Sequence, residues 1–169
     1  MTQATHIVIA GAVAKPLIAS GNPLAIFAVS LFSHYLSDAI PHGDYSLRVV
    51  DDGPSAMDRE IAGSNKDKLV DISKVALDAL VGVACLLALY RPEITLHNAL
   101  IFGAIVLGGM LPDILQPMYY WFKRAPFTYT HAFHNFMHTQ YRLTTMGYKK
   151  TAIISQLVIA MFSLYIIAL

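Results

Sequence analysis

The sequence predicts an all-α membrane protein, a polytopic bundle of about five apolar helices plus one amphipathic, histidine-rich helix. Hydrophobic residues make up 56% of the 169-residue chain and charged residues only 14%, whereas an ordinary soluble domain is about a quarter charged. Several long stretches carry little or no charge, and turn-forming residues separate them. The length suits a single membrane domain over residues 1–169.

The first two apolar segments are expected to pair through a short turn. Residues 6–20 are apolar but too short to span a bilayer unaided. Pro23 suits a helix start, and the second helix is predicted over residues 24–40. Residues 41–67 are polar and are predicted to form a long loop, of a length that is often functional.

The second half of the chain is expected to hold three more apolar helices. Two of them, at 67–90 and 94–111, are again joined by a short turn. The segment 112–150 is aromatic, basic and rich in histidine, as expected at a bilayer interface, with a helix predicted over 127–142. Residues 151–169 carry no charge and give the clearest spanning helix.

The two short turns imply that most polar residues lie on one side of the membrane. The amino terminus, the 41–67 loop and the 112–150 segment all face that side. Basic residues concentrate there: Arg48, Arg59, Lys66, Lys68, Lys123, Arg124, Arg142, Lys149 and Lys150. Because basic residues are enriched in short cytoplasmic loops, we expect a multi-pass protein of a bacterial or archaeal inner membrane with this side in the cytoplasm.

The stretch from Ser33 to Tyr45 holds the first candidate site. His34 and Asp38 are spaced i and i+4, so they share one helix face. A histidine and a carboxylate one turn apart offer half of a divalent metal site. Ionisable groups at membrane depth are costly and usually functional. The alternative is a helix end in the headgroup region, where polar residues cost little.

A second candidate site is the histidine stripe of the predicted interfacial helix. His131, His134 and His138 are spaced i, i+3 and i+7, which places them on one face. Imidazole suits zinc, iron, nickel and copper. The alternative is an amphipathic interfacial helix whose polar face consists of histidine.

Other candidates fall on the same side of the expected topology. Asp113 follows an apolar helix, where the helix dipole disfavours a carboxylate, so a cation partner is expected. Asp78 either ligates or pairs with Lys74 one turn before it. His42 and Asp44 follow the helix break and are candidates for catalysis, either orienting a ligand or a water or, for Asp44, acting as general base.

These candidates are histidine and aspartate without a thiolate, so the expected cofactor is one or two divalent cations, zinc before others. Such an ion activates water and polarises a phosphoryl or carbonyl oxygen. The sequence has no GxSxG motif. Metal-dependent hydrolysis is therefore the leading expectation.

The aromatic residues 119–122 favour a lipid or amphiphile from the bilayer as substrate, with a phosphoester ahead of a carboxylic ester or amide. The net charge of +1 gives no reason to expect nucleic acid as a partner. Two rival classes stay open. One is a non-enzymatic metal-binding or metal-transporting membrane protein, and the other is a structural protein whose histidines bind haem or nothing.

Four short motifs carry a resemblance to a known family. They are Thr5-His6, His34-x3-Asp38, Leu111-Pro112-Asp113 and Thr130-His131. They resemble the TH, HxxxD, LPD and TH elements of the YdjM-like membrane-bound metal-dependent hydrolases. In that family HxxxD follows the LPD and second TH elements, whereas here it precedes both. The HxxxD pair also resembles those of zinc-dependent phospholipase C, which is all-helical. The resemblance implies a membrane-bound hydrolase and makes His6 a further expected metal ligand.

Overall fold

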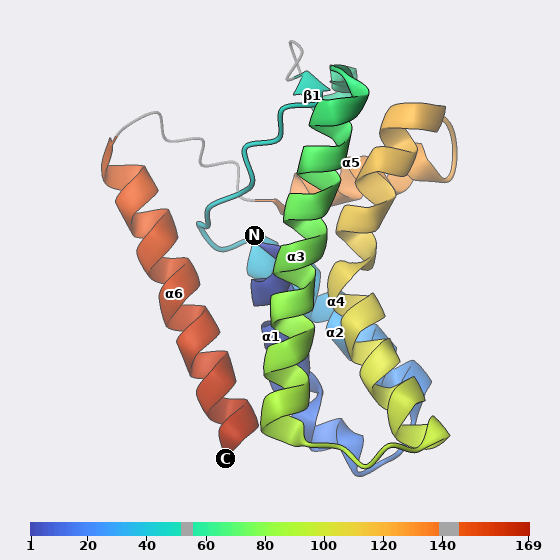
Figure 1. Cartoon of the computed structure of the whole chain (residues 1–169), viewed down its shortest axis with the longest axis vertical. Coiled ribbons are helices and arrows are strands. Elements are labelled where there is room, and N and C mark those ends of the chain that lie inside the picture. The colour runs from blue at the N-terminus through green and yellow to red at the C-terminus, as the bar shows by residue number, and fades with distance from the viewer. Residues whose placement is uncertain (52–55, 139–145) are drawn as a thin grey trace.

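The structure is a computed structural model that describes residues 1–51, 56–138 and 146–169. It confirms the all-α prediction, since the described residues form six α-helices and only a two-residue strand pair (Figure 1). In chain order the elements are α1 (Gln3–Ile18), α2 (Pro23–Asp38), β1 (Val50–Asp51), the 3-10 turn η1 (Ala56–Asp58), β2 (Glu60–Ile61), α3 (Asn65–Tyr90), α4 (Leu96–Phe122), α5 (Phe127–Met137) and α6 (Met146–Ala168).

Local sequence explains where the helices begin. The side chain of Asn22 accepts hydrogen bonds from the backbone N–H groups of Leu24 and Ala25, and Pro23 occupies the first turn of α2. Ser64 and Asp67 form a reciprocal capping box at the start of α3. These caps satisfy backbone donors that a helix start otherwise leaves without partners.

Within the described residues, three helices are long and apolar enough to cross a membrane: α3, α4 and α6 from Lys150 onward. The sequence predicted about five. The difference lies in α1 and α2, which have 16 residues each and are therefore about 24 Å long. The hydrocarbon core of a bilayer is about 30 Å thick, so both helices end inside the depth that α3 and α4 cover.

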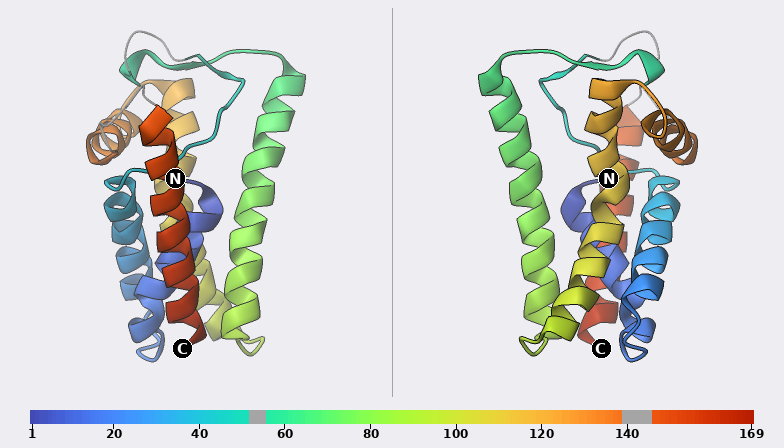
Figure 2. Two further views of the ribbon diagram at one scale, coloured as in Figure 1. Left: turned by 90° about the vertical axis from the view of Figure 1, so that its left-hand side faces the viewer. Right: turned by 90° about the vertical axis from the view of Figure 1, so that its right-hand side faces the viewer.

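Helix α1 occupies the centre of the bundle, where it contacts α2, α3, α4 and α6 (Figure 2). Its residues from Ile7 to Gly11 are all buried, as expected of a helix enclosed on every side. The apolar core around it includes Ile26, Leu86 and Ile105. Large apolar side chains on the outer faces of α3 and α6 are exposed instead, which suits helices that face lipid.

Helix α4 continues through two prolines. The sequence predicted that it ends at Leu111-Pro112-Asp113, but the helix runs on to Phe122 with Pro112 and Pro117 inside it. Each proline removes one backbone hydrogen bond, and the buried packing of Pro112 and Tyr119 retains the helix across them. Asp113 therefore lies inside α4. The predicted 127–142 helix is α5, which ends at Met137, and its last four predicted residues lie outside the described ranges.

The bundle has two different ends. The α1–α2 turn, the α3–α4 connection and the carboxyl terminus lie together at what we call the turn end (Figure 1). The opposite, loop end carries α5 and the later described residues of the 39–64 segment, whose first residues lie beside the amino terminus (Figures 1 and 2). The amino terminus lies between them, about half-way along α3 (Figure 1). The first turn of α1 and the last turn of α2 thus meet at depth within the bundle.

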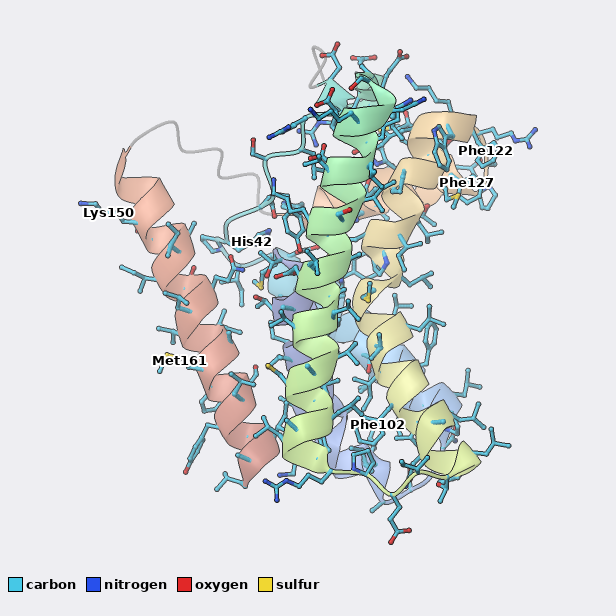
Figure 3. All side chains as sticks on the ribbon, viewed as in Figure 1. His42, Phe102, Phe122, Phe127, Lys150 and Met161 are labelled. Atoms are coloured by element: carbon cyan, nitrogen blue, oxygen red, sulfur yellow. The ribbon has the colours of Figure 1, made fainter. Side chains whose placement is uncertain are left out.

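The loop of residues 39–64 is fastened to α3. The Oδ2 atom of Asp71 accepts hydrogen bonds from the backbone N–H groups of Arg48 (2.6 Å) and Val49 (3.0 Å). The Lys74 ammonium donates to the carbonyl of Ser46 at 2.8 Å. These contacts hold the preceding residues, which include His42, over the start of α1; Figure 3 shows His42 in this place.

Gly108 allows α4 to pack closely on α2. A Cβ atom there would lie 2.6 Å from Ser30 Cβ and 2.7 Å from the carbonyl oxygen of Phe27. We expect Gly108→Ala to lower the free energy of unfolding by about 1–3 kcal/mol, the usual cost of overpacking. Thermal unfolding in detergent measures this. Gly103→Ala is the matched control, because nothing lies within 4 Å of a Cβ atom at Gly103. Equal melting temperatures for the two variants would contradict the packing argument.

Candidate metal centre

The carboxylate of Asp38 is fully buried and lies among four imidazole rings. Its Oδ1 atom is 3.1 Å from Nε2 of His6 and 3.7 Å from Nε2 of His42. Its Oδ2 atom is 3.1 Å from Nε2 of His34 and 2.9 Å from Nε2 of His134. Helices α1, α2 and α5 and the loop after α2 each supply one ring. Residues far apart in sequence therefore converge on one carboxylate.

A second carboxylate from α4 completes what we call the inner group: His6, His34, Asp38, Asp113 and His134. The Oδ1 atom of Asp113 lies 3.8 Å from Nε2 of His34 and 3.6 Å from Nε2 of His134. Its Oδ2 atom accepts a hydrogen bond of 2.5 Å from the side-chain amide of Gln3. The side chain of Asp113 is 26% exposed, whereas those of His6, His34 and Asp38 are 0% exposed.

Three further residues form what we call the outer group: His42, Asp44 and His138. Nε2 of His42 lies 3.0 Å from Oδ1 of Asp44 and 3.3 Å from Nε2 of His138. Nε2 of His138 lies 3.6 Å from Oδ2 of Asp44. Both groups contain sets of three ligand atoms that lie within 4.8 Å of one another, so this cluster could hold a metal ion.

Backbone carbonyls fix the orientation of two of the histidine rings. Nδ1 of His34 lies 2.7 Å from the carbonyl oxygen of Gly109, and Nδ1 of His42 lies 2.6 Å from that of Ile40. A carbonyl oxygen only accepts hydrogen bonds, so both Nδ1 atoms carry the proton. In the neutral rings Nε2 is then a lone pair that points at the cluster, which is the usual arrangement of metal-binding histidine.

The side chain of Ser37 fixes the orientation of the His6 ring. The Ser37 hydroxyl donates its proton to the carbonyl of His34 at 2.8 Å, so it accepts from Nδ1 of His6 at 3.0 Å. Nε2 of His6 again faces Asp38. The rings of His6 and His34 stack with centroids 3.8 Å apart, which brings their Nε2 atoms to the same place.

The Nε2 atoms of His6 and His34 are buried without a hydrogen-bond partner within the described residues. A buried polar atom without a partner is rare and costly. Here two lone pairs also face a carboxylate, which repels them. A divalent cation among these atoms would remove both penalties. The spacing fits as well, because ligand atoms about 2.0–2.1 Å from a tetrahedral zinc lie about 3.3 Å apart, close to the 2.9–3.1 Å separations around Asp38.

Gln116 bridges two histidines of α5. Its side-chain amide bonds to Nδ1 of His134 and, through Oε1, to Nδ1 of His131. With the amide nitrogen on His134, Nε2 of that ring carries the proton and donates to Asp38. Turning the amide over would leave Nε2 of His134 as a lone pair, but Nε2 of His131 would then carry a proton toward the Asn135 amide nitrogen that donates to it here. In this arrangement a cation at His134 therefore takes the place of the proton on Nε2.

His131 lies outside the sets of converging ligand atoms, although it belongs to the predicted stripe. Its Nε2 atom accepts a hydrogen bond of 2.8 Å from the side chain of Asn135, and its ring stacks on Tyr119 at 4.0 Å. In this structure His131 supports Gln116 and the packing of α5 on α4.

Asp78 also lies outside those sets. Its Oδ2 atom accepts hydrogen bonds from the backbone N–H of Ala4, at 2.8 Å, and from the hydroxyl of Tyr45. A carboxylate at a helix amino terminus satisfies donors that the helix leaves open. Asp78 thus anchors the start of α1 at Ala4, which is next to Gln3 and two residues before His6.

The polar residues that support the ligands were not singled out by the sequence reasoning. Gln3, Ser37 and Gln116 each hydrogen-bond to a member of the inner group. A signal existed for all three. Gln3 precedes His6 by three positions, and Ser37 and Gln116 follow His34 and Asp113 by three, so each shares a helix face with a candidate ligand.

The pKa values of Asp44 and His138 in the outer group are shifted. Partial burial opposes ionisation of Asp44, but the facing His42 ring, the amino group of Met1 and His138 together hold the pKa of Asp44 below its ordinary value. The Met1 nitrogen lies 2.7 Å from Oδ1 of Asp44. Burial lowers the pKa of His138 to about 4, so this ring is neutral near pH 7. An ionised carboxylate and a neutral imidazole are the forms that bind metal.

No protein-family model, curated protein or solved structure matches the chain. Function is therefore argued from the geometry of the cluster, because a fold alone does not imply an activity. The resemblance to the YdjM-like hydrolases stays a hypothesis based on four short motifs.

The inner group predicts which histidines bind metal. We expect His34→Ala and His134→Ala, on different helices, each to weaken zinc binding by at least about 100-fold, since changes to supporting residues alone cost 10–100-fold. Mass spectrometry of detergent-purified protein measures the zinc retained after dialysis. His97→Ala is the control, because His97 is exposed at the turn end. Wild-type zinc content in both inner variants would exclude the inner group as the site.

Proposed function

We propose that the chain is a membrane-embedded metal-dependent hydrolase that acts on a phosphoester of a lipid or another amphiphile. The observation that carries the proposal is the buried Asp38 carboxylate, which is surrounded by imidazole nitrogens, two of them without a hydrogen-bond partner among the described residues. The residues that would hold the ion are those of the inner group. Zinc is the first choice for such ligands.

A divalent ion in this place supplies a Lewis acid and lowers the pKa of a bound water to about 7. The chain supplies the rest. The carbonyl of Gly109 and the Ser37 hydroxyl hold His34 and His6 in position. Asp44, whose side chain is 51% exposed, is open to solvent beside the buried cluster. Ionised at neutral pH, it is suited to accept a proton from the attacking water as general base.

The surroundings of the cluster favour an amphiphilic substrate. The centroid of the Tyr35 ring lies 5.7 Å from that of His34 and 4.8 Å from that of Phe133. Phe133 is 49% exposed. At the loop end, Trp121 and Phe122 are 64% and 46% exposed. Exposed aromatic residues of this kind collect at the headgroup level of a bilayer. A lipid phosphoester is the first substrate class to test, and a carboxylic ester or amide is the second.

The proposed location is the cytoplasmic membrane of a bacterium or archaeon, with the loop end in the cytoplasm. The described basic residues support this orientation. Arg48, Arg59, Lys66, Lys68, Lys123 and Arg124 belong to the loop end. Arg91 and Lys15, whose ammonium donates to the carbonyls of Ile166 and Ile167, belong to the turn end. Basic residues near spanning helices favour the cytoplasmic side.

The orientation can be tested by cysteine labelling. In a Cys85→Ser background, we expect a membrane-impermeant maleimide to label Ser20→Cys in intact cells and Lys66→Cys only after lysis. Ser20 lies at the turn end and Lys66 at the loop end, and both are exposed. Labelling of Lys66→Cys in intact cells would place the loop end outside.

Metal binding without catalysis is the alternative function. Transport across the bilayer has less support, because the core on the turn-end side of the cluster consists of apolar residues such as Ile7, Ile26, Ile101 and Ile105. An ion pathway needs polar groups across the membrane. Binding without turnover would give metal content but no hydrolysis of any ester.

Hydrolysis is tested on phosphatidic acid in mixed micelles and on p-nitrophenyl phosphate. We expect chelation to abolish the release of phosphate and zinc or manganese to restore it. Asp38→Asn is expected to lower kcat by at least about 100-fold, because metal-ion catalysis is worth several kcal/mol. Glu93→Gln at the turn end is the control and retains the wild-type rate. Turnover that survives chelation would contradict the proposal.

A further inference from the structure

The outer group has the geometry of a cation site in its own right. Nε2 of His42 is 3.0 Å from Oδ1 of Asp44 and 3.3 Å from Nε2 of His138. Ligand atoms of a tetrahedral zinc site lie about 3.3 Å apart. The three residues come from the loop after α2 and from the residue that follows α5, so only the folded chain brings them together.

Two imidazole nitrogens face each other in this group. Nδ1 of His42 donates to the carbonyl of Ile40, which makes Nε2 a lone pair in the neutral ring. Nε2 of His138 lies 3.3 Å from it. Two such nitrogens approach this closely only with a proton or a cation between them. The adjacent carboxylate of Asp44 favours a full positive charge at that place.

Asp38 connects the outer group to the inner one. Its Oδ2 atom faces His34 and His134, which belong to the inner group. Its Oδ1 atom lies between the two groups, 3.1 Å from Nε2 of His6 in the inner group and 3.7 Å from Nε2 of His42 in the outer group. A carboxylate that borders both groups can bridge two cations. Two-metal sites that hydrolyse phosphoesters hold their ions about 3.5–4 Å apart.

We propose that the chain binds two divalent cations bridged by Asp38, with the second ion held by His42, Asp44 and His138. This inference rests on the proposed function and extends its metal site; with the second ion bound, Asp44 is a ligand in place of the general base. The two positions differ in access, because the side chains of Asp44 and His138 are 51% and 30% exposed while His6, His34 and Asp38 are fully buried. The inner position therefore fills first and exchanges slowly. The outer one fills second, exchanges faster, and is where an anionic phosphoester oxygen reaches a cation.

The amino group of Met1 is the competing occupant. Its nitrogen lies 2.7 Å from Asp44 and 3.4 Å from Asp38. These carboxylates therefore attract a positive charge at this place whether it is an ammonium or a metal ion. If the ammonium alone neutralises them, the outer group binds no cation and the chain takes up a single ion.

The test is a titration of metal-free protein with Mn²⁺, followed by electron paramagnetic resonance. Manganese is paramagnetic and accepts carboxylate ligands. We expect the first equivalent to give the spectrum of an isolated ion. The second equivalent should give an exchange-coupled spectrum, because one carboxylate joins the two ions. Stoichiometry comes from mass spectrometry of the same samples.

Variants of the outer group separate this proposal from the proposed function. His138→Ala and Asp44→Asn are each expected to bind one ion with no coupling, and the retained inner ion shows that the variants are folded. His97→Ala is the control and should give the coupled spectrum of the wild type. A single ion in the wild type, or two ions without coupling, would overturn the two-cation site and leave a one-ion hydrolase standing. No ion in the wild type would overturn both.

Discussion

The burial of one carboxylate, that of Asp38, governs the design of this protein. An ionised carboxylate that leaves water without compensation costs several kcal/mol, and Asp38 is fully buried. Imidazole rings from α1, α2 and α5 face its oxygens. The contacts with Asp38 therefore help to fix the positions of α1, α2 and α5. A cation in the cluster would satisfy rings and carboxylate together, which links metal binding to the stability of the bundle.

The depth of the cluster follows from helix length. Helices α1 and α2 have 16 residues, against 26 in α3 and 27 in α4. Helix termini carry backbone groups that need partners, and the ends of these two short helices lie inside the bundle. At the start of α1, the backbone N–H of Gln3 donates to the Tyr45 hydroxyl and that of Ala4 donates to the Asp78 carboxylate. The same polar surroundings that satisfy the helix ends make room for His6 and Asp38 at a depth where charged groups are otherwise expensive.

Sequence reasoning identified the all-α class and most of the residues that converge, because these follow from local patterns. It expected about five apolar helices to span, whereas three of the described helices are long enough, and it placed Asp78 among the ligands, whereas Asp78 binds the start of α1. Short stretches of sequence are enough to show that His34 and Asp38 lie one helical turn apart and that the long helices carry little charge. It did not separate His131 from His134, since both lie on the same stripe of α5. Their difference comes from Gln116 and Asn135, whose contacts depend on how α5 packs against α4. The passage of α4 through Pro112 likewise depends on tertiary packing.

The enclosed position of α1 bears on how the chain assembles. It precedes the other helices in the sequence, yet it contacts α6, which follows them all. At about 24 Å, with Lys15 and Pro16 inside it, it is poorly suited to stay in lipid alone. Its polar first turn, which carries His6, must wait for partners from later helices. Helix α1 thus reaches its final environment only after the later helices that enclose it are in place, so the cluster forms late in the assembly of the bundle.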